Sequence, residues 1–184
     1  ICDGKDNDCD GVNDNGCDLK GHSLRVELSW DGPGDLDLHL HNSTPTPWFE
    51  SGNSNNDCYY VFKNPDWNVQ GSKFDDPLLD VDKTANFGPE NIRIERSIPG
   101  ETYTIGVNNY VYAAGRIATI SIFCGNILIP TAVYVSRPFT GTKGGDCTSN
   151  DFWKVAKVVF ASSGTCVVSS INSYSSSYAR CISF

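Results

Sequence analysis

The sequence predicts an all-β protein, a β-sandwich of the immunoglobulin-like or jelly-roll-like type, preceded by a short acidic arm. Three observations lead to this prediction. From residue 23 onward, short runs alternate apolar and polar side chains with the period of two that is typical of strands, and clusters of Gly, Pro, Asn and Asp separate these runs. No stretch repeats apolar residues at helical spacing. The acidic residues are 17 Asp and only 5 Glu, and Asp favours turns over helices.

The composition limits the classes of protein that the chain can belong to. Its 184 residues, 39% of them hydrophobic, fit one globular domain with a small appendage. A net charge of −8 argues against binding to nucleic acid or to an anionic membrane. No apolar run approaches the ~18 residues of a membrane-spanning helix. Eight Cys, no Met and a first residue Ile predict an extracellular or cell-surface protein whose signal peptide has been removed.

Residues 1–20 form the acidic arm, which carries six Asp and three Cys but almost no apolar side chain. Such a segment cannot fold on a hydrophobic core and needs disulfides or metal. It has the spacing of an EF-hand-type calcium loop up to its ninth position, with Gly11 at the sharp turn, although Cys17 stands where the final Glu belongs. The candidate calcium ligands are Asp6, Asp8, Asp10, Val12 through its carbonyl, Asp14 and Asp18. The alternative is a disulfide-held acidic linker that binds no ion.

The arm resembles the MopE-type repeat of secreted bacterial proteins, which is regarded as metal-binding, and shares its acidic core with the thrombospondin type 3 repeat. The matching residues are Cys2, Gly4, Asp6, Asp8, Cys9, Asp10, Gly11, Asp14, Gly16 and Cys17. Both resemblances imply a calcium-binding arm.

Residues 21–136 are expected to form the core of the sandwich, and residues 137–184 to complete or extend it. The expected strands are 23–30, 35–41, 59–62, 90–97 and 102–111, then a hairpin over 116–136 turning at Gly125-Asn126, a hairpin of 152–162 and 165–171 turning near Ser163-Gly164, and 177–184. Segments 42–58 and 63–80 are longer than ordinary hairpin loops, which is typical of functional or ion-binding segments.

Two D-x-D pairs predict a second calcium site in the body of the chain. Asp35 and Asp37 alternate with leucines on one strand, and Asp80 and Asp82 alternate with Leu79 and Val81 on another. Such pairs repel unless a cation lies between them. Asp31 and Glu90 are additional candidate ligands. The alternative is a solvated polar sheet face on which the pairs lie apart.

Residues 24–135 also resemble the YfaP-like secreted β-domain of bacteria. The resemblance rests on a W-D-x-x-x-D-L-D-L-H pattern, a C-Y-Y pattern and an L-D-V-D-x-T-x-x-x-G-P-E-N pattern. The matching residues are Trp30, Asp31, Asp35, Asp37, Cys58, Tyr59, Asp80, Asp82, Gly88, Pro89, Glu90 and Asn91. The resemblance implies a β-sandwich at the cell surface and no particular activity.

Other residues carry weaker signals. Asn42-Ser43-Thr44 is an N-glycosylation acceptor sequence. His39 and His41 could bind zinc or copper, but two ligands are too few for a closed site, so an exposed polar pair is the simpler interpretation. An aromatic set could stack against sugars or could anchor the core and loops, and it comprises Trp48, Phe49, Tyr59, Tyr60 and Trp67. The eight Cys allow 105 disulfide connectivities.

The sequence favours a structural role over catalysis. It contains no nucleophile motif and no zinc-protease motif, so we expect a protein that is not an enzyme. An arm without a core must dock on something, and docking on the next subunit head-to-tail would build a filament. We therefore expect a calcium-stabilised subunit of an extracellular polymer that self-associates through its arm and β-edges. The alternatives are a calcium-dependent carbohydrate- or surface-binding module and an accessory domain of a larger secreted protein.

Overall fold

The computed structural model describes residues 23–42, 44, 46, 48–49, 56–85, 87–111, 113–141, 152–163 and 165–175. Within these ranges the chain forms ten strands and no helix, so the all-β prediction is confirmed. The strands are β1 Leu24–Trp30, β2 Asp35–Asn42, β3 Asp57–Cys58, β4 Pro77–Val81, β5 Glu90–Ile94, β6 Thr102–Val111, β7 Ala118–Cys124, β8 Ala132–Val135, β9 Phe152–Phe160 and β10 Cys166–Ser175. The predicted calcium arm, with all of its candidate ligands, and the predicted strand 177–184 lie outside the described residues.

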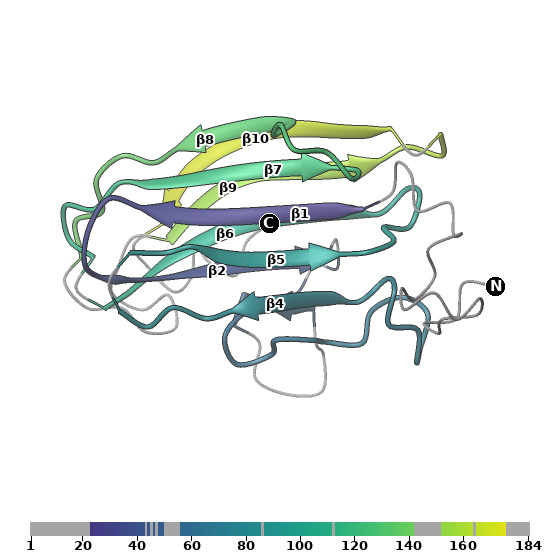
Figure 1. Cartoon of the computed structure of the whole chain (residues 1–184), viewed down its shortest axis with the longest axis horizontal. Coiled ribbons are helices and arrows are strands. Elements are labelled where there is room, and N and C mark those ends of the chain that lie inside the picture. Colours follow the sequence, from purple (N-terminus) through teal and green to yellow (C-terminus); the bar gives the residue numbers. More distant parts are fainter. Residues whose placement is uncertain are drawn as a thin grey trace.

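The strands form two antiparallel sheets that pack face to face as a sandwich (Figure 1). One sheet has the order β4-β5-β1-β7-β8, and the other has the order β10-β9-β6-β2-β3. Contacts between β2 and β5 and between β3 and β4 place the corresponding strands of the two sheets opposite one another. The edge strands β4 and β3 therefore share one long side of the sandwich, and β8 and β10 share the other.

Strand β1 shows how the sequence pattern builds the core. Its burial alternates along LRVELSW, so that Leu24, Val26, Leu28 and Trp30 point inward. It lies in the centre of its sheet, where it pairs with β5 on one side and β7 on the other. The leucines of β2 meet these side chains from the opposite sheet, and this interleaving forms one continuous hydrophobic core.

Strand β2 differs from the expectation because both of its faces are buried. We predicted that His39 and His41 form an exposed polar pair, and this prediction is wrong, since both side chains are 0% exposed. The physical reason is a second, smaller aromatic layer on the outer face of β2. Trp48 and Phe49 from the long loop after β2, together with Phe152 of β9, pack on these rings.

Three further boundaries differ from the prediction. Residues 59–62 form a tight bend, in which the Tyr59 N–H donates to the Phe62 carbonyl at 3.1 Å. The strand predicted there is instead β3, which comes just before the bend. The end of the predicted loop 63–80 is β4, which pairs with β5. The hairpin of β7 and β8 is confirmed, but its connection spans residues 125–131 rather than a turn at Gly125-Asn126.

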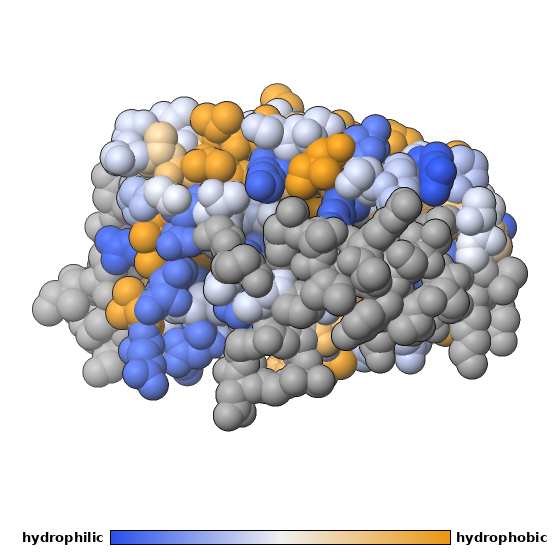
Figure 2. Space-filling model, turned by 180° about the vertical axis from the view of Figure 1, so that it is seen from behind, coloured by the Kyte–Doolittle hydropathy of each residue, from blue (hydrophilic) through white to orange (hydrophobic). Residues whose placement is uncertain are grey.

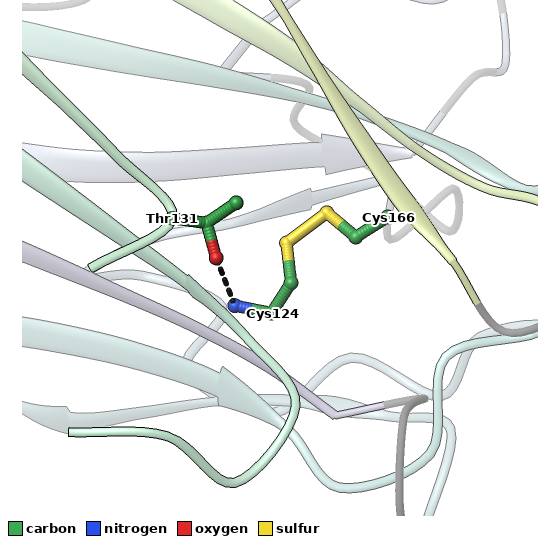
Figure 3. Close-up of a disulfide and its surroundings, with 3 residues drawn as sticks. All are labelled: Cys124, Thr131 and Cys166. Carbon is green, nitrogen blue, oxygen red and sulfur yellow. Dashed lines mark hydrogen bonds between the residues drawn. A yellow bond between two sulfur atoms is a disulfide. The ribbon is translucent and has the colours of Figure 1, made fainter. Parts of the chain in front are cut away.

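A disulfide joins the two sheets on the side of β8 and β10. It links Cys124, the last residue of β7, to Cys166, the first residue of β10 (Figure 3). The backbone N–H of Cys124 donates to the Thr131 hydroxyl at 3.0 Å, which holds the following loop against the bridge. Cys58 is a buried thiol that donates weakly to the Lys63 carbonyl.

Candidate metal centre

Three carboxylates meet on the opposite side of the sandwich from the disulfide. Asp37 comes from β2, Asp82 directly follows β4, and Glu90 begins β5. Each offers one oxygen, and these oxygens all lie within 4.8 Å of one another. The group therefore draws ligands from both sheets, at the place where β2 faces β5.

Glu90 is held at the centre of this group by two backbone donors. The Leu38 N–H donates to Oε2 at 2.7 Å, and the Lys83 N–H donates to Oε1 at 3.0 Å. The first bond exists because β3 pairs with Leu40 and His41, and among the described residues no strand pairs with the edge of β2 beyond them. A glutamate from the facing sheet satisfies that edge, and its side chain is only 1% exposed.

Two buried oxygens beside the group have no hydrogen-bond donor in the described structure. They are Oδ1 of Asp35 and Oδ1 of Asn108. Asp35 is 6% exposed, and Asn108 uses its amide nitrogen to bond Oδ2 of Asp37 at 3.2 Å. Buried oxygens that lack a donor are costly, so a cation at this place would satisfy atoms that the described residues leave unpaired.

Burial makes the charged forms of these acids unfavourable. It is the main cause that raises the pKa of Asp37 to about 8, and the charges of Glu90 and Asp35 add to the rise while His39 opposes it. Burial likewise raises the pKa of Glu90 to about 8, against the two backbone donors and with help from Asp82 and Asp35. The pKa of Asp35 is raised to about 6 by burial and by the charge of Asp82.

The positive charge near the group falls short of its negative charge. Among the residues that the structure describes, the ion pairs to these four carboxylates come from Lys63 alone, whose Nζ lies 3.0 Å from Oδ2 of Asp82. That contact is at the surface, because the Lys63 side chain is 49% exposed. If all four carboxylates were ionised, their negative charge would exceed what one lysine offsets, and a divalent cation would balance the excess.

The remaining members of the predicted site lie elsewhere. Asp80 is exposed and accepts a hydrogen bond from Nε of Arg93 at 3.1 Å. Asp31 accepts from the Ile117 backbone at 2.9 Å and joins two loops. The register of β4 shifts between Leu79 and Val81, and this bulge breaks the simple alternation that would place Asp80 and Asp82 on one face.

The donor set fits a hard cation. Carboxylate and amide oxygens are the ligands that Ca²⁺ prefers, and Ca²⁺ accepts six to eight of them in flexible geometry. Asp35, Asp37, Asp82 and Glu90 would supply carboxylate oxygens, and Asn108 would supply an amide oxygen. Asn108 gave no signal in the sequence, because only the pairing of β6 with β2 brings it opposite Asp37.

Two other predicted features lie among the described residues. Nδ2 of Asn42, the atom that would carry an N-linked sugar, donates to the Asn56 side chain at 2.9 Å. Trp48 and Trp67 are each 3% exposed, so they pack inside the protein and do not form an exposed sugar-stacking platform.

A histidine and a carboxylate also form a close pair on the outer face of β2. Nδ1 of His39 lies 2.8 Å from Oδ2 of Asp57. The imidazole is covered by four aromatic rings, and Tyr59 stacks on it with a ring separation of 4.8 Å. Because His39 is 0% exposed, this pair does not reach solvent in the described conformation.

No family model matches the chain, and no curated protein matches it. Among solved structures, the chain is similar to the crystal structure of SAV2460, a protein of unknown function. The two are 15% identical, the similarity covers 86% of this chain and 92% of that chain, and the TM-score is 0.49. A likeness of this degree carries no argument about function. The described residues contain no helix long and apolar enough to cross a bilayer.

Proposed function

We propose that this chain is a secreted, non-catalytic structural module whose sandwich is closed by a bound calcium ion. The observation that supports the proposal is the meeting of Asp37, Asp82 and Glu90 between the two sheets, with Asp35 beside them. A calcium ion bound there would tie the edge of β2 to β4 and β5. The acidic arm, with its calcium-loop spacing, would bind a second ion.

The first test is the effect of calcium on stability. A ligand that binds only the folded state at a concentration of 100 Kd stabilises by about 2.7 kcal/mol, which raises Tm by about 5–10 °C for a chain of this size. We expect such a rise when calcium is added to chelator-treated protein, and a smaller one with magnesium, which prefers a stricter octahedral shell. Differential scanning calorimetry measures both.

Two neighbouring aspartates provide the variant and its control. Asp82→Asn removes a proposed ligand, so calcium should shift its Tm less than that of the parent protein. Asp80→Asn changes an exposed residue that pairs with Arg93 outside the group, so its calcium response should stay intact. An equal response in Asp82→Asn and the parent would contradict the site in the sandwich. An unchanged Tm in the parent would contradict calcium binding as a whole.

We further propose that the module self-associates into an extracellular assembly. In support, the edge strand β8 presents apolar side chains to solvent, with Val133 52% and Val135 60% exposed, and the preceding loop exposes Leu128 and Ile129. Figure 2 shows apolar patches along the upper side of the molecule, where Figure 1 places β8 and β10. Exposed β-edges are templates for pairing with another chain.

Electron microscopy and sedimentation velocity test assembly directly. Regular fibres or oligomers in calcium that disperse in a chelator would support an assembly that depends on bound metal. Single particles under both conditions would overturn the proposed self-association while leaving the calcium site to be judged by its own melting experiment.

A further inference from the structure

A groove lies at the end of β4 and β5 that is remote from the acidic group. It runs between the connection that precedes β4 and the turn that joins β5 to β6, and it has a volume of about 440 Å³. Small-molecule sites span roughly 300–1,000 Å³. Val69, Ile98 and Pro99 form apolar parts of its walls, and Asp75, Arg96 and Ser97 contribute polar atoms.

Only one of the two carboxylate oxygens of Asp75 accepts a hydrogen bond from the described residues. Its Oδ2 accepts from the Val69 N–H at 2.8 Å, which fixes the side chain against the loop. Its Oδ1 is buried and has no hydrogen-bond partner in the described structure, although the residue is only 3% exposed. The groove thus contains a fixed, charged acceptor that lacks a donor.

A second polar group at the groove also lacks a partner. The hydroxyl of Ser97 is buried without a hydrogen bond, and the residue is 0% exposed. The Tyr103 hydroxyl lies near Ser97 and near the Ile98 backbone, and both groups oppose the rise of its pKa that burial causes. The Ser97 hydroxyl can both donate and accept, so a ligand atom at hydrogen-bond distance would satisfy it.

The rim of the groove carries a positive charge, opposite to that of the Asp75 carboxylate. Arg96 is exposed and lines the groove, while its backbone N–H is fixed to the Phe74 carbonyl at 2.7 Å. The neighbouring Asp76 is directed away, because its Oδ1 accepts from the Trp67 N–H at 2.7 Å. A ligand in this groove would therefore meet one carboxylate, one guanidinium, a hydroxyl and an apolar wall.

We propose that this groove binds a neutral sugar ring. Sugar hydroxyls donate and accept, so one can donate to Asp75 while a neighbour accepts from Arg96, and the C–H face of the ring can lie on Ile98 and Pro99. A simple cation would meet the like charge of Arg96, and a simple anion would meet that of Asp75, so a ligand without net charge suits the pair best. The proposal goes beyond the structural role and uses none of the proposed calcium ligands.

The experiment is a titration of the full, isotope-labelled chain followed by amide NMR. The probes are glucose, galactose, mannose and N-acetylglucosamine, with methylammonium and acetate as charged comparisons. We expect saturable shifts at the Val69, Arg96 and Ile98 amides with at least one sugar. Arg96→Ala and Asp75→Asn should each weaken that binding by about tenfold, because a site built for hydroxyls loses affinity when a partner is removed.

Controls separate this site from general effects. Arg25→Ala removes an arginine that packs on Phe123 in β7 and should leave the sugar affinity unchanged. Arg96→Ala alters an exposed side chain, so it keeps the test valid if Asp75→Asn fails to fold. Asp82→Asn should lose the calcium response and keep the sugar response, which makes the failure of one proposal distinguishable from the failure of the other.

Three results would overturn the proposal. One is the absence of saturable shifts with every sugar, which would mean that only water fills the groove. Another is equal sugar affinity in the parent, Arg96→Ala and Asp75→Asn. The third is tighter binding of methylammonium or acetate than of any sugar, which would assign the groove to a charged ligand.

Discussion

On the side of the sandwich where β7 and β10 lie, a covalent bond joins the two sheets, whereas on the side of β2 and β4 the sheets meet through carboxylates. The first connection responds to reductants and is indifferent to pH and metal. The second consists of buried acids whose charge depends on both. The comparison shows that the two sheets of one fold can be joined by two different kinds of connection. Reductants act on the disulfide, whereas pH and metal ions act on the buried acids.

The largest expected effect comes from the covalent side. The bridge of Cys124 to Cys166 spans a sequence separation of 42 residues. In the loop-entropy treatment, a loop of that length is worth about 4 kcal/mol. We expect the double variant Cys124→Ser/Cys166→Ser to lose about that much unfolding free energy in urea denaturation, with or without calcium. A loss that appeared only in chelator would show that the two sides are coupled rather than separate.

The next effect tests the centre of the acidic side. Glu90→Ala leaves the buried N–H of Leu38 without its acceptor and removes the part-buried bond from the Lys83 N–H. An unsatisfied buried donor costs about 1–3 kcal/mol and a lost partly exposed bond about 1 kcal/mol, so we expect a loss of about 3 kcal/mol by urea denaturation, together with the loss of calcium stabilisation. Glu95→Ala is the control, since Glu95 pairs with Arg93 at the surface. Equal losses in the two variants would refute a special role for Glu90.

The third prediction concerns pH and metal-free protein. Asp37 and Glu90 have pKa values of about 8 when folded, against ordinary values of 3.8 and 4.5. Between these values the folded state holds protons that the unfolded chain has released, so stability is greatest at the acidic end and falls as pH rises. We expect Tm in chelator to fall by about 5 °C or more from pH 5 to pH 8. Calcium should reduce the fall, and a Tm that rises with pH in chelator would contradict this reading.

The smallest effect is expected at the surface charges beside the acidic side. Arg93→Ala removes exposed bonds to Asp80 and Glu95. Such pairs contribute about 0–1 kcal/mol, so Tm should change by no more than about 4 °C. A larger change would mean that these exposed pairs, and not the buried acids alone, hold β4 to β5.

The sequence predicted the strands well because their burial follows a period of two, as in β1, and because β-branched residues mark β7 and β9. It predicted Asp35, Asp37 and Asp82 as neighbours from charge alternation alone. It could not separate Asp80 from Asp82, because a one-residue bulge in β4 is invisible in the pattern.

The burial of His39 was equally hidden from the sequence. One alternating strand looks the same whether its polar face meets water or an aromatic loop, and here the covering rings come from residues 48–49 and from Phe152, far along the chain. The partners of the buried acids also come from distant segments, since Glu90 reaches Leu38 across 52 residues and Asn108 reaches Asp37 across 71. Contacts of this length depend on sheet topology, which local patterns do not contain.

The position of Cys166 at the first residue of β10 has a mechanical consequence. Within the described part of the chain, β10 is an edge strand whose strand partner is β9, so tension on the chain beyond Ser175 would peel it from that end, one rung at a time. The peeling would stop at Cys166, where the force would pass through sulfur to Cys124 at the end of β7. Because β7 pairs with the central strand β1, the pull would then act on the hydrogen bonds of the other sheet.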